Sequence, residues 1–451
     1  MSDLLGIGKS GVMAYQTALS AISENVVNAN TDGYSRRQVT MSEASAGAGP
    51  MYLYRPSTAF GGVQATQVTR VWDQYAASKA WTANSDNSQA SARSTYFGDV
   101  QSALNDGDSG VGVKLTAVFT ASSALAANPT DATLRQSMLY ALQDAAGAIT
   151  TTGSNLSQLS GNVSTQANIA VGQVNDALTA LTKVNLALLS SPQGTSGRAT
   201  LEDQRDSIIG TISDKLGVDV SFDINGAATV RMNNPGGPTL VSGTSTVPAS
   251  LSLAVSATGT LSMTMTSGGT TAAVSPTSGA LAGYAEAANQ IAGRRQQMDA
   301  LAANFAQTIN SWNSNGTDNA GNPGAALMSG TDAASLAVSV TDPNLIAAAD
   351  SANTSPNANL LALQSLRGPT GVEATWKGIV NDQALKVQSA QTQAATAASA
   401  KDSAYSDLDN VSGVNLDTEA ADLMRFQQAY SASAKIIQTA RDTLQSILAL
   451  F

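Results

Sequence analysis

The sequence predicts a mainly α fold: an elongated multi-domain rod with a terminal coiled coil, a body of long helices and an inserted small antiparallel β-domain. Three observations predict it. Apolar residues recur every seventh position near both ends of the chain, long alanine- and serine-rich stretches carry narrow apolar stripes, and one central segment alternates apolar and polar residues. Long helices with narrow stripes are typical of rods, because only one side of each helix can be buried.

Both ends of the chain carry a heptad pattern, which is the signature of a coiled-coil seam. Near the N-terminus it runs through Leu5, Val12, Leu19 and Val26, interleaved with Gly8, Tyr15, Ile22 and Ala29. Near the C-terminus it runs through Leu416, Leu423, Tyr430, Ile437, Leu444 and Phe451, with Phe426, Ala440 and Ile447 between them and Ser433 off the pattern. We therefore assign residues 1–59 and 412–451 to a terminal coiled-coil domain, whose seam positions should be largely exposed in an isolated chain.

The predicted body contains long helical stretches near residues 72–104, 132–190, 280–312 and 373–408. Pro129 interrupts the helix that precedes the second stretch, and Thr130 or Asp131 can cap the next one. The helical body domain thus comprises residues 60–216 and 280–411.

Between the two parts of the body, residues 217–279 alternate apolar and polar positions around Asn225-Gly226, a strong signal for a two-residue hairpin. This segment is the predicted β-domain. Residues 315–371 are loop-rich, with short helices expected near Asp332 and Leu360.

Composition narrows the function classes. The net charge of −10 and the pI near 4.5 argue against nucleic-acid binding, which needs a concentrated basic surface. The chain contains no cysteine and no histidine, which removes thiolate chemistry and the commonest general base and metal ligand. We expect neither a Sec-type signal nor a membrane span, because the first residues lack a basic region followed by an apolar stretch and no apolar run is long enough.

Three motifs could carry chemistry, and each has a simpler interpretation. The stretch 107–114 lacks the Gly-Lys-Ser/Thr of a phosphate loop, and in 318–322 Ala320 stands where a calcium ligand should. The carboxylates Glu202, Asp203 and Asp206 could support acid/base work, but Arg205 lies among them, which favours a solvated or ion-paired helix face. No catalytic, cofactor-binding or metal-binding residue is predicted.

Three segments resemble a known family. "NVVNANTDGYSRRQ", from Asn25, is similar to the N-terminal signature of flagellar axial proteins, the rod, hook and hook-associated proteins. The segment Leu201–Met232 resembles one particular to hook-associated proteins of the first hook–filament junction, and Ser412–Leu448 resembles the C-terminal signature of that family. Longer members carry a further outer domain before the last helices, whereas Asn315–Gly371 is short here.

The resemblance implies a structural adaptor, not an enzyme, that leaves the cell by type III export, polymerises at the hook tip and joins hook to filament. Its partners would be copies of itself, the hook protein below, the second junction protein above, and an export chaperone with the export apparatus, with no cofactor, nucleic acid or membrane. In this family the terminal helices form the inner tube of the axis. The expected subunit-interface residues are Leu5, Val12, Leu19, Ile22, Val26, Asn28, Asn30, Tyr34, Arg36, Leu416, Leu423, Phe426, Tyr430, Ile437, Leu444 and Ile447.

Other functions remain as alternatives. Another axial protein, such as the hook protein or the second junction protein, would share the terminal helices, although Leu201–Met232 argues against both. A secreted enzyme using carboxylate chemistry would need a convergent polar site, and a chemoreceptor-like coiled coil would need a membrane span.

Overall fold

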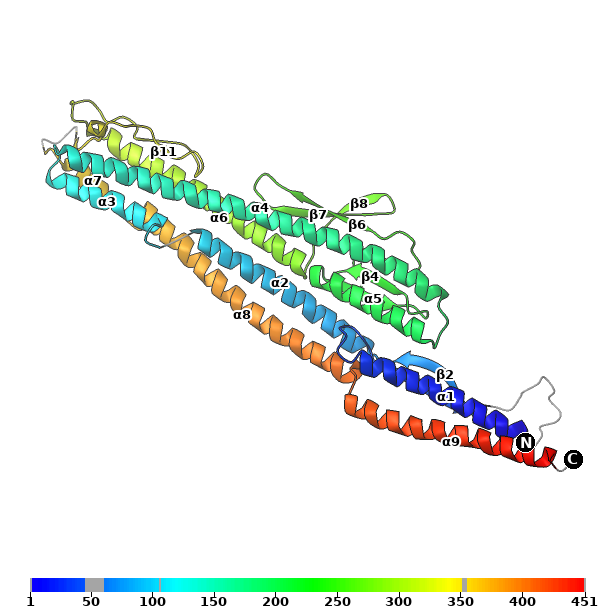
Figure 1. The fold of residues 1–451 in the computed structure, drawn as a ribbon. Helices are drawn as coiled ribbons and strands as arrows, with labels where there is room; N and C mark the ends of the chain where they lie inside the picture. Colours follow the sequence, from blue (N-terminus) through cyan, green and yellow to red (C-terminus); the bar gives the residue numbers. More distant parts are fainter. Residues whose placement is uncertain (1, 45–60, 105–106, 351–354, 450–451) are drawn as a thin grey trace.

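The chain forms a long rod whose two ends meet in one helical pair (Figure 1). The computed structural model describes residues 2–44, 61–104, 107–350 and 355–449, so Phe451 of the heptad pattern lies outside it. Helices α1 (Ser2–Val27) and α9 (Leu416–Leu448) lie side by side at one end of the rod, and we call them the terminal pair. The predicted elongated, mainly α fold is confirmed.

The rest of the rod is the body, in which long helices run nearly parallel to the rod axis (Figure 1). They are α2 (Gln74–Leu104), α3 (Val111–Ala127), α4 (Ala132–Ser190), α5 (Ser196–Lys215), α6 (Ala280–Ser314) and α8 (Val372–Ser412). The short helix α7 (Ala358–Ser365) precedes α8. Asp131 caps α4 by accepting hydrogen bonds from the backbone N–H groups of Thr133 and Leu134. The predicted helix start after Pro129 is therefore confirmed, with Asp131 as the capping residue.

Two hydrophobic clusters run along the body. The outer one joins α3, α4, α6 and α8 around large buried side chains such as Phe119, Phe305 and Trp376. The second joins α4 and α5 to the β-strands around Leu178, Ile209 and other aliphatic residues. Because α4 contributes to both clusters, it is the continuous spine of the body.

The segment 217–279 forms two small antiparallel sheets. The first contains β3 (Val218–Phe222), β4 (Ala228–Met232) and β5 (Thr239–Val241), and the second contains β6 (Ser250–Val255), β7 (Leu261–Ser267) and β8 (Thr270–Val274). The predicted hairpin at Asn225-Gly226 joins β3 to β4, but its loop is longer than the two residues expected, because strand pairing ends at Phe222 and Ala228. Gly226 takes a φ of 72° that favours glycine. Both sheets are hydrogen-bonded to α4. The side-chain amide of Asn175 donates to the backbone carbonyl of Leu251 and accepts from its N–H group. The side-chain amide of Asn185 makes the same two hydrogen bonds with Ala228.

Two details differ from the sequence-based expectations. An antiparallel pair of strands after Tyr34, β1 (Arg37–Glu43) and β2 (Val63–Arg70), was not predicted. Near Leu360 the expected short helix is α7, but the helix expected near Asp332 is wrong. Asp332 forms a turn because its carboxylate accepts hydrogen bonds from the N–H and the hydroxyl of Ser335.

Besides α7, the described residues of the loop-rich segment 315–371 add only minor elements to the rod. They are β9 (Gly316–Thr317), β10 (Met328–Ser329), β11 (Ala337–Val338), the 3₁₀ turn η1 (Pro343–Leu345) and β12 (Ala349–Asp350). β9 pairs with β12, and β10 pairs with β11.

Candidate assembly interface

Small residues hold the two helices of the terminal pair together. Gly8, Gly11, Ala14 and Ala18 of α1 are buried, and the two glycines face α9. A Cβ atom on Gly8 would lie 2.7 Å from Cγ1 of Ile437, and one on Gly11 would lie 2.6 Å from the hydroxyl oxygen of Ser433. The glycines therefore allow the helix backbones to approach closely, and Ser433, which falls off the heptad pattern, occupies the seam because it is small.

This seam leaves much of the predicted interface set on the surface. Exposed members are Leu5, Val26, Asn30, Leu416, Leu444 and Ile447. Half-buried members are Val12, Leu19, Asn28, Tyr34, Arg36, Leu423, Phe426, Tyr430 and Ile437, and Ile22 is buried. The expectation that the whole seam is largely exposed in the isolated chain is therefore wrong for Ile22 and for the half-buried members, because α1 and α9 already cover them.

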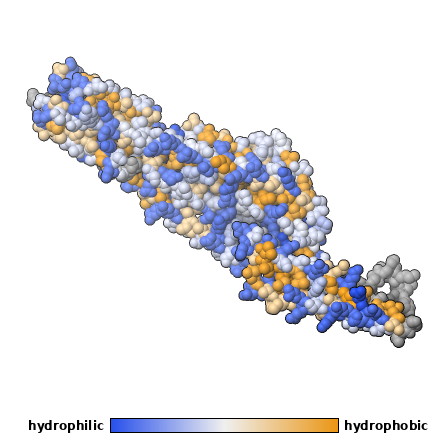
Figure 2. Space-filling view, viewed as in Figure 1, coloured by the Kyte–Doolittle hydropathy of each residue, from blue (hydrophilic) through white to orange (hydrophobic). Residues whose placement is uncertain are grey.

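Several exposed apolar residues extend this surface beyond the predicted set. They are Leu4, Met13, Val27, Met424 and Leu448, with Val27 80% and Leu448 72% exposed. Figure 2 shows hydrophobic patches at the junction between body and terminal pair and at the free end of the pair. Residues adjacent to the heptad positions on the helical wheel could have been included from the sequence, because two helices cannot cover every face of each other.

The end of α1 is fixed by a buried asparagine. Asn25 is 1% exposed, and its carbonyl oxygen accepts hydrogen bonds from the Tyr34 hydroxyl at 2.8 Å and from the backbone N–H of Arg37 at 2.7 Å. Its amide nitrogen donates to the backbone carbonyl of Arg37 at 2.9 Å and to Glu419 at 3.0 Å. One side chain thus joins α1, the following turn, β1 and α9.

Arg36 closes the same junction from the other side. Its guanidinium lies 2.6 Å from the carboxylate of Glu419, which is 1% exposed, and its backbone N–H donates to the carbonyl of Ser412 at 2.8 Å. The two places where the chain passes between body and terminal pair are therefore bonded to each other. Asn28 makes only local contacts: its amide donates to the carbonyl of Glu24, and its side-chain oxygen accepts from the hydroxyl of Thr31. These bonds help to end α1.

Arginines neutralise the carboxylates of α5. Arg37 lies 2.7 Å from Asp203, and Arg70 lies 2.6 Å from Asp206 and 3.1 Å from Glu202. Both arginine side chains are at most 5% exposed, so each partner compensates a charge that would be costly to bury alone. The three carboxylates form an ion-paired helix face, as the simpler interpretation of the sequence predicted.

The hydroxyl of Tyr34 is partly shielded from solvent in this junction. Burial raises the pKa of this hydroxyl from 10.0 to about 12, and the Arg37 guanidinium, 4.8 Å from the ring centre of Tyr34, opposes the rise only in part. Tyr34 therefore stays protonated and serves as a hydrogen-bond donor to Asn25.

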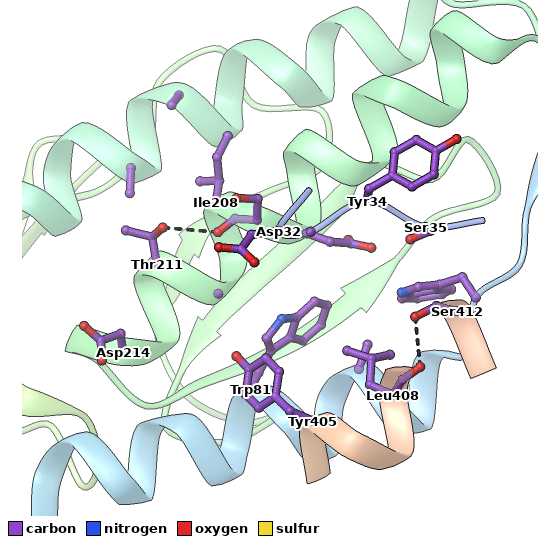
Figure 3. Close-up of a pocket in the computed structure, with 18 of the residues that line it drawn as sticks. Asp32, Tyr34, Ser35, Trp81, Ile208, Thr211, Asp214, Tyr405, Leu408 and Ser412 are labelled. Carbon is purple, nitrogen blue, oxygen red and sulfur yellow. Dashed lines mark hydrogen bonds between the residues drawn. The ribbon is translucent and has the colours of Figure 1, made fainter. Parts of the chain in front are cut away.

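A groove of about 900 Å³ lies where the terminal pair meets the body, and we call it the junction groove. Figure 3 shows its walls: the turn at Asp32, Tyr34 and Ser35, helix α5 at Ile208 and Thr211, and side chains of α2 and α8. Trp72, Trp81, Ile208, Tyr405 and Leu408 give the groove apolar and aromatic surface. Sequence reasoning did not find it, because its walls come from five separate parts of the chain.

No group of three or more acidic side chains suited to holding a metal ion occurs in the described part of the chain. Within the same residues, no helix is long and apolar enough to cross a membrane.

Comparison with known families finds two matches. The family model of the flagellar hook-associated protein FlgK helical domain matches residues 97–328, just over half of the chain. The model of the flagellar basal body rod FlgEFG protein C-terminal region matches residues 409–450, which include α9.

Curated relatives match over the full length. Flagellar hook-associated protein 1 of Escherichia coli (strain K12) is 23% identical over 553 aligned positions, covering 99% of this chain and 100% of that protein. The protein of the same name from Bacillus subtilis (strain 168) is 23% identical over 510 positions, covering 99% and 98%. Both alignments are longer than the 451 residues of this chain, so these relatives contain insertions.

A solved structure is also similar. The flagellar hook junction protein FlgK from Burkholderia pseudomallei aligns with a TM-score of 0.50 and 26% identity. The aligned part covers 56% of this chain and 46% of that one, so less than half of the solved chain is matched.

Proposed function

This chain belongs to the flagellar hook-associated protein FlgK family, and from that premise we propose that it is a structural adaptor of the bacterial flagellum. In this proposal it polymerises at the hook tip and joins hook to filament. The full-length similarity to proteins named flagellar hook-associated protein 1 supports the junction in preference to the hook itself or the second junction.

One observation carries the proposal: the terminal pair exposes apolar residues along both helices. Val27, Leu416 and Met424 are each at least half exposed, although all lie on well-formed helices. Burying such side chains is worth about 25 cal/mol per Å² of apolar surface, so contacts with neighbouring subunits would stabilise a polymer. The terminal pair is therefore the part of the chain that we assign to the inner tube.

The partners follow from the position in the axis. We propose that the neighbours are copies of this chain, with the hook protein below and the second junction protein above, and that an export chaperone and the type III export apparatus deliver the chain to the flagellum outside the cell. The match of residues 409–450 to the C-terminal region of the flagellar basal body rod FlgEFG proteins supports an axial position for α9.

A secreted enzyme is the alternative of another class. It would need unpaired carboxylates close together, whereas Glu202, Asp203 and Asp206 are held by arginines. The ion pairs favour the structural role, and we propose that the chain is not an enzyme.

The test uses flagellated cells that lack their own hook-associated protein 1. We expect this chain to restore swimming and to appear by immunogold electron microscopy between hook and filament. Leu444→Asp, which places a charge on an exposed apolar position of α9, should abolish incorporation and release unpolymerised flagellin. Thr443→Asp, an exposed position on the opposite face of α9, is the control. Labelling elsewhere on the flagellum, or no labelling of the well-expressed wild-type chain, would reject the proposal.

A further inference from the structure

The junction groove has an acidic rim. Asp32, Asp176 and Asp409 line it, are exposed, and make no side-chain hydrogen bond or ion pair to any other residue that the structure describes. The groove's basic residue, Lys215, lies 2.7 Å from Asp214 and is neutralised by it. The groove therefore combines an aromatic and apolar lining with three unpaired carboxylates. A partner surface that carries both basic and apolar side chains would complement it.

The free end of α9 offers such a surface. Every described residue after Ala440 is exposed, so this end extends beyond the cover that α1 provides. Arg441, Leu444 and Leu448 are spaced three and four residues apart and therefore lie on one face of the helix. Lys435 and Arg441 have no carboxylate partner among the described residues, so their charges are available.

We propose that the free end of α9 in one copy binds the junction groove of a neighbouring copy. Leu444 and Leu448 would lie against Trp72, Trp81 and Ile208, and Arg441 would face Asp176 and Asp409. This inference rests on the proposed function, because it names the surface through which subunits of the axis meet.

The contact must form between copies. Helix α9 spans Leu416–Leu448, about 48 Å at the rise of an α-helix, and its first residue lies at the junction while its last lies at the far end of the rod (Figure 1). The groove and the helix end of one molecule are therefore too far apart to meet. Two different surfaces that bind each other form a head-to-tail contact, which generates a closed ring or an open helical polymer.

The absence of cysteine makes cross-linking a clean test. The full chain with Thr211→Cys in the groove and Leu448→Cys on α9 would be expressed in flagellated cells, and sheared flagella would be oxidised. We expect disulfide-linked dimers and larger multimers on a non-reducing gel. The control pairs Leu448→Cys with Ser137→Cys, an exposed position near the other end of α4, and should give no multimers above background.

Charge exchange tests the specificity of the contact. Arg441→Asp in the cross-linking chain should lower the multimer yield about tenfold, since it places like charges together. Adding Asp176→Arg and Asp409→Arg should restore the yield. Lys9→Glu makes a similar charge change on the other helix of the pair and should have a smaller effect. Thermal melting shows whether each variant is folded.

The outcomes separate this inference from the proposed function. One outcome is that the chain with Thr211→Cys and Leu448→Cys is incorporated at the hook–filament junction and yet gives no more multimers than the Ser137→Cys control. In that case the groove contact is wrong and the proposed adaptor function is unaffected. Equal losses for Lys9→Glu and Arg441→Asp, with no rescue, would also overturn the groove contact. If the wild-type chain never enters the flagellum, the proposed function itself fails.

Discussion

Asn25 and Glu419, 394 residues apart in the sequence, are joined by a hydrogen bond of 3.0 Å inside the junction between the terminal pair and the body. Each side chain is 1% exposed. Glu419 also receives the guanidinium of Arg36 at 2.6 Å, so its buried charge is neutralised. The polar end of α1 is therefore a connector that sets how α1 leaves the body and where α9 begins.

Removing the connector should loosen the terminal pair. Asn25→Ala leaves a buried N–H and carbonyl of Arg37 without their partner, at a cost of about 1–3 kcal/mol for each unsatisfied group. We expect faster hydrogen exchange in α1 and β1, measured by mass spectrometry, with little change in the body. Asn28→Ala removes only local contacts, to Glu24 and Thr31, and is the control. Equal exchange in the two variants would contradict a connecting role for Asn25.

The hydroxyl of Tyr34 predicts a specific dependence on pH. Burial raises its pKa to about 12 in the folded chain, whereas an unfolded tyrosine ionises near its ordinary value of about 10. Its stabilising contribution is therefore present below about pH 10 and is lost as the pH rises towards about 12. The difference in free energy of unfolding between the wild-type chain and Tyr34→Phe, which cannot ionise, should shrink over that range in denaturant titrations.

Tyr75→Phe is the control for this measurement, because Tyr75 is 86% exposed and lies outside the junction. It should leave the free energy of unfolding unchanged at both ends of the pH range. A constant difference between the wild-type chain and Tyr34→Phe across the range would show that the hydroxyl is not buried.

The glycines of α1 predict opposite effects at neighbouring positions. A Cβ atom at Gly8 would meet Ile437 at 2.7 Å, whereas one at Gly6 would meet no atom within 4 Å. Gly8→Ala should therefore separate the helices, at a cost of about 1–3 kcal/mol. Gly6→Ala should stabilise α1 by up to about 1 kcal/mol, because alanine has the higher helix propensity. Limited proteolysis of the terminal pair measures both, and a similar response at the two sites would contradict the close-packed seam.

The sequence predicted the features that depend on local patterns. The heptad pattern predicted the terminal helices. Pro129 and Asp131 predicted where α4 begins, and Asn225-Gly226 predicted a hairpin between two strands. The features that depend on distant residues could not be predicted in this way. The partners of Asp203 and Glu419 lie 133 or more residues from them in the N-terminal segment, and the junction groove exists only after α2, α4, α5 and α8 have packed.

The β-segment shows the same limit. Alternation predicted strands over 217–279, but it could not show that their inner face completes the core of α4 and α5. Arg198 and Arg205 on α5 also donate hydrogen bonds to the carbonyls of Asn225 and Gly226, so the hairpin and the ion-paired face of α5 are directly connected. Side-chain partners of this kind have no periodicity along the chain.

Substitutions at Ile437 and at Leu444 distinguish an effect on folding of the isolated chain from an effect on assembly. The side chain of Ile437 is half-buried against Gly8, whereas Leu444, one heptad later, is 40% exposed. Ile437→Asp would place a carboxylate in the seam, so it should weaken the terminal pair of the isolated chain and also block incorporation into flagella. Leu444→Asp should block incorporation while leaving the isolated pair intact.

Circular dichroism and hydrogen exchange of the purified chains, combined with imaging of flagella, distinguish these two effects. Gln438→Asp, on the exposed side of α9 next to Ile437, should be mild in both assays. If Ile437→Asp left hydrogen exchange in α1 unchanged, the helices would not pack as tightly as the Gly8 contact requires. If Leu444→Asp cells built normal filaments, the exposed apolar end of α9 would not take part in assembly, because a buried unpaired carboxylate would disfavour every subunit addition by about two orders of magnitude or more.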